Sequence, residues 1–222
     1  MVFAEVEIPF LQTWPTWKES PVSGLGSGFG LSFWRAQKEV DENLYQAFGR
    51  WDFGFYGGGF SYRYLEMDSL YRQSFGRLNS SLLWKYGGVG AGYGLSMEWL
   101  PGQSLWSRHL YSAGALGRWR EVSFGLWLEG FTDESPRWYG SLDFSPVENL
   151  RLFAESNLDY VLVGYAFSYS IFQLTSVFRT PGFAVSLGIS VTLDHWSLGG
   201  SRDFSGQELG WNGIWLVKSL RK

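Results

Sequence analysis

Apolar and polar residues alternate along most of this chain, and the alternation is strictest over residues 89–99. The odd-numbered positions, from Val89 to Trp99, are apolar or aromatic, whereas the even-numbered ones are glycine, Ser96 and Glu98. Successive side chains of a strand point to opposite faces, so these two sets line opposite sides. The length of this stretch, eleven residues, is also about what a tilted strand needs to cross a bilayer. The pattern predicts a strand between lipid and a polar lumen.

The same period of two recurs from one end of the chain to the other, and no long window has a helical period. The expected strands cover 2–10, 24–33, 44–56, 60–64, 70–86, 89–99, 111–120, 122–129, 138–144, 150–155, 161–168, 172–179, 183–193 and 209–218. That is about fourteen strands, or about twelve if the weak ones within 137–156 merge. We therefore predict an all-β fold: a single closed antiparallel up-and-down transmembrane β-barrel forming one domain over residues 1–222.

A water-soluble sandwich or lipocalin-type barrel would also alternate, so composition has to separate it from a membrane barrel. Aromatic residues make up 19% of the chain, and glycine dominates many of the polar faces. Glycine packs poorly in an exposed sheet but suits a crowded closed interior. Strand ends also carry aromatic residues of the kind that form a membrane girdle. These girdle candidates are Trp84, Tyr86, Trp99, Trp106, Trp119 and Trp138.

Charged residues of both signs fall on the faces that would line the lumen. Strand by strand, the predicted lumen-lining residues are Arg50, Asp52, Arg63, Arg77, Lys85, Glu98, Arg118, Arg120, Glu129, Asp143, Arg151, Glu155, Arg179 and Asp194. Opposite charges in a confined interior pair with each other. Twelve to fourteen strands lie between the filled eight-stranded barrels and the open sixteen-stranded ones. The lumen is thus expected to be either a weakly selective pore or a largely sealed network of ion pairs.

Two connections are long, residues 11–23 and 195–208, and each contains aromatic residues. In a closed barrel the first and last strands are neighbours, so these loops are expected beside the seam at one rim. The rim residues would be Trp14, Trp17, Trp196 and Phe204. They could anchor the barrel in the membrane interface, or they could form a docking or gating surface for a partner protein. The Gly-Gly turns expected at the same rim are unusually short, which leaves the strand count open.

Catalytic and metal chemistry find little support in the sequence. The chain has no cysteine and two histidines, and its net charge of −3 gives no field for nucleic acid. His109 and Ser112 are three positions apart, so a strand would point them to opposite faces, and adjacent Asp194 and His195 also point apart. The glycine-rich stretches match no phosphate loop. We expect no enzyme activity, no cofactor and no metal.

Through its strand lengths, aromatic strand tips and succession of hairpins, nearly the whole chain resembles bacterial outer-membrane β-barrel proteins as a class. One departure is the ending, where Trp215 is followed by Lys218–Lys222 instead of a terminal aromatic residue. The resemblance implies an outer-membrane location, in the mature form after removal of a signal peptide, with membrane lipid as the partner and an oligomeric state left open. The expected function is a channel for passive passage of small solutes. The alternative is a non-conducting barrel that docks a partner protein through loops 11–23 and 195–208.

Overall fold

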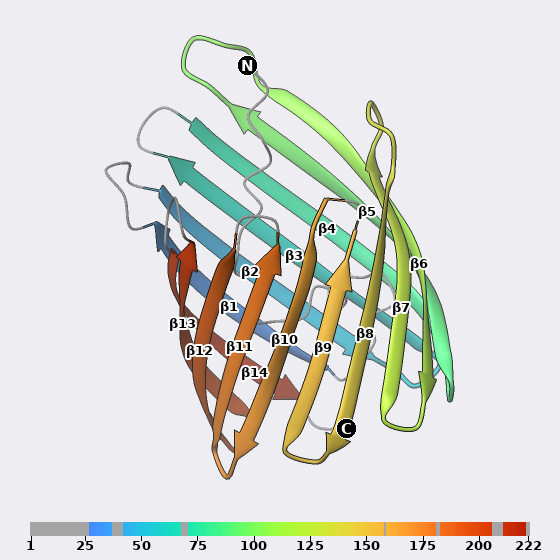
Figure 1. Ribbon diagram of the computed structural model, residues 1–222. Coiled ribbons are helices and arrows are strands. Elements are labelled where there is room, and N and C mark those ends of the chain that lie inside the picture. The colour runs from blue at the N-terminus through green and yellow to red at the C-terminus, as the bar shows by residue number, and fades with distance from the viewer. Residues whose placement is uncertain are drawn as a thin grey trace.

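The computed structural model is a closed antiparallel barrel in which each strand pairs with its neighbours in sequence and β14 closes the ring against β1 (Figure 1). It describes residues 27–36, 42–67, 71–157, 159–180, 183–205 and 211–220. The strands are β1 (Ser27–Ala36), β2 (Glu42–Asp52), β3 (Tyr56–Met67), β4 (Tyr71–Trp84), β5 (Gly87–Trp99), β6 (Trp106–Trp119), β7 (Val122–Phe131), β8 (Arg137–Val147), β9 (Leu150–Ser156), β10 (Val161–Tyr169), β11 (Phe172–Thr180), β12 (Ala184–Leu193), β13 (Trp196–Ser205) and β14 (Trp211–Leu220). The predicted all-β, up-and-down barrel is confirmed. No helix among the described residues is long and apolar enough to span a membrane.

The ring is built from a different set of strands than the sequence pattern indicated. The strand expected over 2–10 lies outside the described residues, and β1 pairs directly with β14 to complete the ring. The long loop predicted over 195–208 is wrong for most of its length, because β13 pairs with both β12 and β14. The outward side of β13 carries Gly200 and Arg202 near its end. These residues interrupt the apolar row and hide the strand in the sequence.

The two ends of the barrel differ in their connections. At one end, which we call the turn rim, hairpins close through residues 53–55, 85–86, 120–121, 148–149, 170–171 and 194–195. The same rim holds the start of β1 and the end of β14. At the opposite end, the loop rim, β5 passes to β6 through 100–105 and β7 to β8 through 132–136. Figure 1 shows the long 100–105 connection in green at the top and the tight hairpins at the bottom.

The outer surface of the barrel carries large apolar side chains around its whole circumference. Large apolar side chains at outward positions are about half exposed, including Leu78 at 62%, Leu126 at 53% and Ile189 at 57%. A soluble monomer exposes no more than a few hundred Å² of continuous apolar surface. A ring of such strands therefore requires lipid around it, and the water-soluble alternative does not fit this outer surface.

The inner surface carries both apolar clusters and charged groups. One cluster contains Trp34, Leu44 and Leu65 on β1, β2 and β3. It lies toward the loop rim and is joined by half-buried Trp215 of β14. A second cluster contains Phe153, Leu162 and Val177 on β9 to β11. The arc of the wall formed by β4 to β8 carries polar groups, and it holds the candidate site.

Candidate functional site in the barrel lumen

Arg77 of β4 lies at the centre of a polar network on the inner wall. Its guanidinium donates from Nε to Asn79 Oδ1 at 3.0 Å, from Nη2 to Ser112 Oγ at 2.8 Å and from Nη1 to Glu129 Oε2 at 2.7 Å. Only 5% of the Arg77 side chain is exposed, against 24% of Glu129. A nearly buried guanidinium with three partners, one of them a carboxylate, is held in a fixed orientation.

The backbone register explains why Arg77 can reach across three strands. Asn79, Gly92, Ser112 and Glu129 are direct neighbours in one row across β4, β5, β6 and β7. Gly92 has no side chain, and a Cβ there would contact Asn79 Oδ1 and would lie 2.6 Å from Ser112 Oγ. The glycine-rich inner face of β5 therefore provides the space in which the Arg77 network forms. The site thus depends on the glycines that alternate with apolar residues over 89–99.

A second group of polar side chains lies at the loop rim. Gln73 Nε2 donates to Glu98 Oε1 at 3.2 Å, and the guanidinium of Arg108 lies 3.3 Å from the same oxygen. Arg108 also pairs with Glu134 in the 132–136 loop at 2.6 Å. Its guanidinium lies 4.6 Å from the centre of the Trp106 ring and 4.3 Å from that of the Phe131 ring. Arg108 thus links the loop to the lumen mouth through ion pairs and two cation–π contacts.

Further charged groups continue the polar wall on β8 and β9. Asp143 accepts from Arg151, with Arg151 Nε at 2.6 Å, and the two residues lie on adjacent strands. Glu155 is only 4% exposed and accepts a hydrogen bond from the Tyr160 hydroxyl at 2.6 Å. These carboxylates have hydrogen-bond donors within reach, as buried ionised groups require.

Most residues predicted to line the lumen lie on inward-facing positions of the strands. The described ones are Arg50, Arg63, Arg77, Glu98, Arg118, Glu129, Asp143, Arg151, Glu155 and Arg179. Asp52 ends β2, and its side chain is outside the described part of the structure. The structure joins Arg77 with Glu129 and Arg151 with Asp143. Arg77 and Glu129 are 52 positions apart in the sequence, whereas Arg151 and Asp143 are eight apart in one hairpin.

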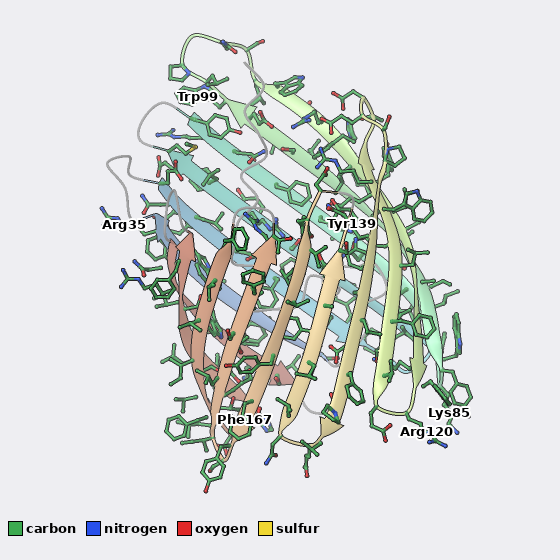
Figure 2. All side chains as sticks on the ribbon, in the orientation of Figure 1. Arg35, Lys85, Trp99, Arg120, Tyr139 and Phe167 are labelled. Atoms are coloured by element: carbon green, nitrogen blue, oxygen red, sulfur yellow. The ribbon has the colours of Figure 1, made fainter. Side chains whose placement is uncertain are left out.

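Three predicted lumen residues are instead in hairpin turns at the turn rim, namely Lys85, Arg120 and Asp194. Each occupies the first position of a two-residue turn and is exposed, and Figure 2 shows Lys85 and Arg120 at the same end of the barrel. Arg120 and Asp194 have positive φ angles of 54° and 52°. A tight hairpin turn requires such a conformation, so strand alternation does not extend to these residues. The sequence pattern had continued the alternation past the observed ends of these strands, by two residues after Trp84 and by one after Trp119 and Leu193.

The aromatic girdle residues are placed at both rims. Trp84, Trp119 and Trp138 lie at outward strand ends and are more than half exposed, Tyr86 lies in a turn, and Trp99 ends β5 at the loop rim (Figure 2). Trp106 differs from the prediction. It is the register partner of Glu98 and stacks against Arg108, so it belongs to the lumen mouth instead of the lipid face.

The predicted aromatic patch at one rim does not form as expected. Trp196 and Phe204 start and nearly end β13, on its outward face, and eight residues of strand separate them by about 26 Å. One therefore lies at the turn rim and the other at the loop rim. Trp14 and Trp17 lie outside the described residues. The docking surface proposed for segment 195–208 loses its structural basis, because most of that segment is barrel wall.

Several inward residues were missed by the sequence analysis. β6 begins at Trp106, five residues before its expected start at 111, so Arg108 was not assigned to a face. Arg108 and Ser112 are four positions apart, so they lie on the same face of the strand, and this spacing could have identified Arg108 as inward-facing. Trp127 is 4% exposed and stacks on Tyr139 with a ring separation of 5.3 Å. Trp127 is two positions from Glu129 and therefore lies on the same, inward face of β7. The sequence analysis overlooked it because only charged residues were sought at inward positions.

The residues considered for catalysis are separated in the structure. His109 is on the outward face of β6, where its Nδ1 lies 2.6 Å from the Tyr93 hydroxyl, whereas Ser112 faces the lumen. His195 lies in the turn after Asp194. Across the described ranges, no group of three or more histidines and carboxylates is arranged to hold a metal ion.

Comparisons with known proteins identify the fold but no family. No family model and no curated protein sequence matches the chain. The barrel is similar to the crystal structure of Omp33, an outer membrane protein of Acinetobacter baumannii, with 9% identity, a TM-score of 0.61, and coverage of 89% of this chain and 100% of that one. A triple mutant of the Rhodopseudomonas blastica porin matches with 7% identity, a TM-score of 0.49, and coverage of 87% of this chain and 99% of that one. The fold of this chain is thus that of the bacterial outer-membrane β-barrels that its sequence resembles.

Proposed function

We propose that the protein is a channel of the bacterial outer membrane that passively conducts small solutes. The single observation that carries this proposal is the way in which charges are held on the inner wall. Arg77 lies along the wall over Gly92, with all three of its hydrogen-bond partners on β4, β6 and β7. A charge held along the wall lines a path, whereas one extending across the lumen would obstruct it.

Two other ion pairs have the same form. Arg108 pairs with Glu98 on the adjacent strand, and Arg151 pairs with Asp143, also on an adjacent strand. The polar arc of β4 to β9 thus offers donors and acceptors to hydrated solutes, while the apolar cluster around Trp34 lies on the neighbouring strands β1 to β3. Such a lumen favours small polar solutes over large or apolar ones. The location follows from the apolar outer surface and from the fold, which is shared with Omp33.

Single-channel recording in planar bilayers tests the proposal. The purified, refolded protein is expected to give discrete current steps in KCl, and a folded barrel that passes no current at any voltage would exclude the channel. Glu129→Gln adds a test of the path itself. Removing this carboxylate leaves the Arg77 charge uncompensated, so the reversal potential in a KCl gradient should move toward chloride selectivity.

Glu66→Gln is the matched control for the selectivity experiment. Glu66 is also a carboxylate paired with an arginine, Arg72, at 3.2 Å, but it is on the outward face of β3. Its neutralisation should leave the reversal potential unchanged. If the two variants shift the potential equally, the current does not pass along the Arg77 wall.

A further inference from the structure

One outward-facing row of residues near the loop rim is polar over six consecutive strands and ends on Trp99 in the seventh. Each member is the direct register partner of the next, from β13 through β14 and β1 to β5. The row is Arg202, Asn212, Arg35, Asn43, Glu66, Arg72 and Trp99. The outward positions nearer the middle of these strands are mostly apolar, so the polar row marks a change in the environment around the barrel.

The two outward rows below this polar row show its depth in the membrane. On β1 to β3 the first contains Phe33, Tyr45 and Tyr64, whose rings contact one another at 5.1 Å and 6.2 Å between centroids. On β14 and β13, below Asn212 and Arg202, it contains Ile214 and Gly200. The second contains Leu216 and Leu31. On β1 the order from Leu31 through Phe33 to Arg35 is the order from hydrocarbon through the interface to the headgroups. The polar row thus lies at the level of lipid phosphates.

This feature is confined to one side of the barrel. Among the described outward positions of β6 to β12, no residue is charged. The described outward-facing arginines of the loop rim, Arg35, Arg72 and Arg202, all belong to the other half of the ring. A general preference for cations at the membrane interface would distribute them around the whole circumference. Their restriction to one arc instead indicates a local site.

Within the row, the three arginines differ in position. Arg72 on β4 pairs with Glu66 at 3.2 Å and lies 5.2 Å from the centre of the Trp99 ring, and Arg202 on β13 lies 5.2 Å from the centre of the Phe204 ring. Arg35 and Arg202 flank Asn212 on three adjacent strands, and both are exposed. Neighbouring strands are about 4.8 Å apart, so the Cα atoms of Arg35 and Arg202 are separated by about 10 Å. Figure 2 shows Arg35 at the outer edge of the barrel.

We propose that Arg35, Asn212 and Arg202 bind the phosphate headgroup of an anionic membrane lipid, whose acyl chains lie on the aromatic and aliphatic rows below. Guanidinium groups bind phosphate oxygens in a bidentate manner, and two of them separated by this distance can converge on one phosphate above the Asn212 amide. The acyl chains of a lipid would contact the apolar rows below the site, whereas a free phosphate ion would not. This proposal does not depend on whether the barrel conducts.

Native mass spectrometry of the protein released from a mild detergent tests the site by counting retained lipids. The probe is phosphatidylglycerol, with phosphatidylcholine and oleate as comparison lipids and inorganic phosphate as a competitor. The wild-type protein should retain one phosphatidylglycerol in preference to phosphatidylcholine or oleate, and millimolar phosphate should not displace it. The Arg35→Gln/Arg202→Gln variant should bind phosphatidylglycerol about tenfold or more weakly, since each interfacial arginine contributes attraction to an anionic lipid.

Arg72→Gln is the matched control, because it removes an arginine of the same row on β4, four strands away from Asn212. It should retain phosphatidylglycerol as the wild-type protein does, and circular dichroism should show every variant folded. The proposal is overturned if the double variant binds as the wild type does, if Arg72→Gln weakens binding equally, or if oleate binds as well as phosphatidylglycerol. Displacement by inorganic phosphate would also overturn it, because the ligand would then be the free ion.

Discussion

Two arcs of the inner wall use glycine in the same geometric way but for opposite chemistry. On β5, the missing side chain of Gly92 leaves room for the Arg77 network, with Ser112 Oγ at 2.6 Å from where a Cβ would lie. On β14, the missing side chain of Gly213 leaves room for the ring of Trp34, which is 1% exposed. The glycine-rich alternation therefore does not by itself indicate a wide pore. It indicates a wall on which large neighbouring side chains lie flat.

The difference between the two arcs separates a part of the wall that stabilises the barrel from a part that, in the proposed channel, lines the path of the solutes. Trp34 lies on Gly213, stacks with Trp215 at 6.4 Å, and packs against Leu44 and Leu65. This arc buries apolar surface in the manner of a protein core. The Arg77 arc buries a charge that must be fully hydrogen-bonded to be tolerated. Substitutions in the first arc should mainly affect unfolding, and those in the second should also affect conduction.

The largest effect is expected for Trp34→Ala. Loss of this fully buried ring leaves a cavity against Gly213, and the free energy of unfolding should fall by about 3–5 kcal/mol. Denaturant unfolding of the barrel in detergent micelles, followed by tryptophan fluorescence, measures the loss. Phe53→Ala is the control, since Phe53 is 71% exposed in a hairpin turn. An equally small effect of both variants would show that the Trp34 cluster is not a core.

Intermediate effects are expected when a methyl group is added to each glycine. At Gly213 the new Cβ meets the enclosed Trp34 ring, so Gly213→Ala should cost about 2–3 kcal/mol of unfolding free energy. At Gly92 it meets the ends of Asn79 and Ser112, which can shift, so Gly92→Ala should cost about 1–2 kcal/mol. Gly92→Ala should also change the single-channel conductance, whereas Gly213→Ala should not.

The same unfolding and conductance measurements on Gly140→Ala provide the control for these two variants. A Cβ at Gly140 would meet no atom within 4 Å, so any cost there reflects only the change in backbone freedom. If Gly92→Ala and Gly140→Ala behave alike in both measurements, Gly92 does not hold space for the Arg77 network.

The smallest effect is expected for Glu134→Gln at the lumen mouth. The Glu134 side chain is 40% exposed, and an ion pair of this exposure contributes less than about 1 kcal/mol. The substitution should therefore leave global unfolding almost unchanged. It should speed hydrogen exchange of the amides in residues 132–136, because the loop loses its link to Arg108. Unchanged exchange in that loop would show that the ion pair does not hold it.

The fold could be predicted from the sequence because lipid and lumen impose the same alternation on every strand. The strand at 89–99 was predicted within two residues of its start, since Gly87 and Gly88 proved to be strand instead of turn. The strand count was also right, but through a different set of strands. The prediction counted residues 2–10 as a strand and did not count 196–205 as one. As a result, it placed the long loops and the short turns at the same rim, which is unusual. In the structure, the chain enters β1 at the turn rim, and the short turns lie together there.

The candidate site was less accessible to prediction, for a physical reason. Alternation assigns a residue to a face but not to a partner, so Arg77 and Glu129 were both assigned to the lumen without being linked. Their contact depends on the register of four strands and on the absence of a side chain at Gly92. Alternation also fails at turns and strand ends, where the chain leaves the sheet. This explains the errors at Lys85, Arg120 and Trp106.

The most direct test of the lumen wall uses the absence of cysteine from the chain. Ser123 of β7 faces inward beside Arg118 and Asp143, and Ser176 of β11 faces outward between Leu174 and Phe178. In planar bilayers, a charged methanethiosulfonate reagent should reduce the current through Ser123→Cys and leave that through Ser176→Cys unchanged. If Ser123→Cys conducts and its current is unaffected by the reagent, the polar inner wall does not line the conducting path.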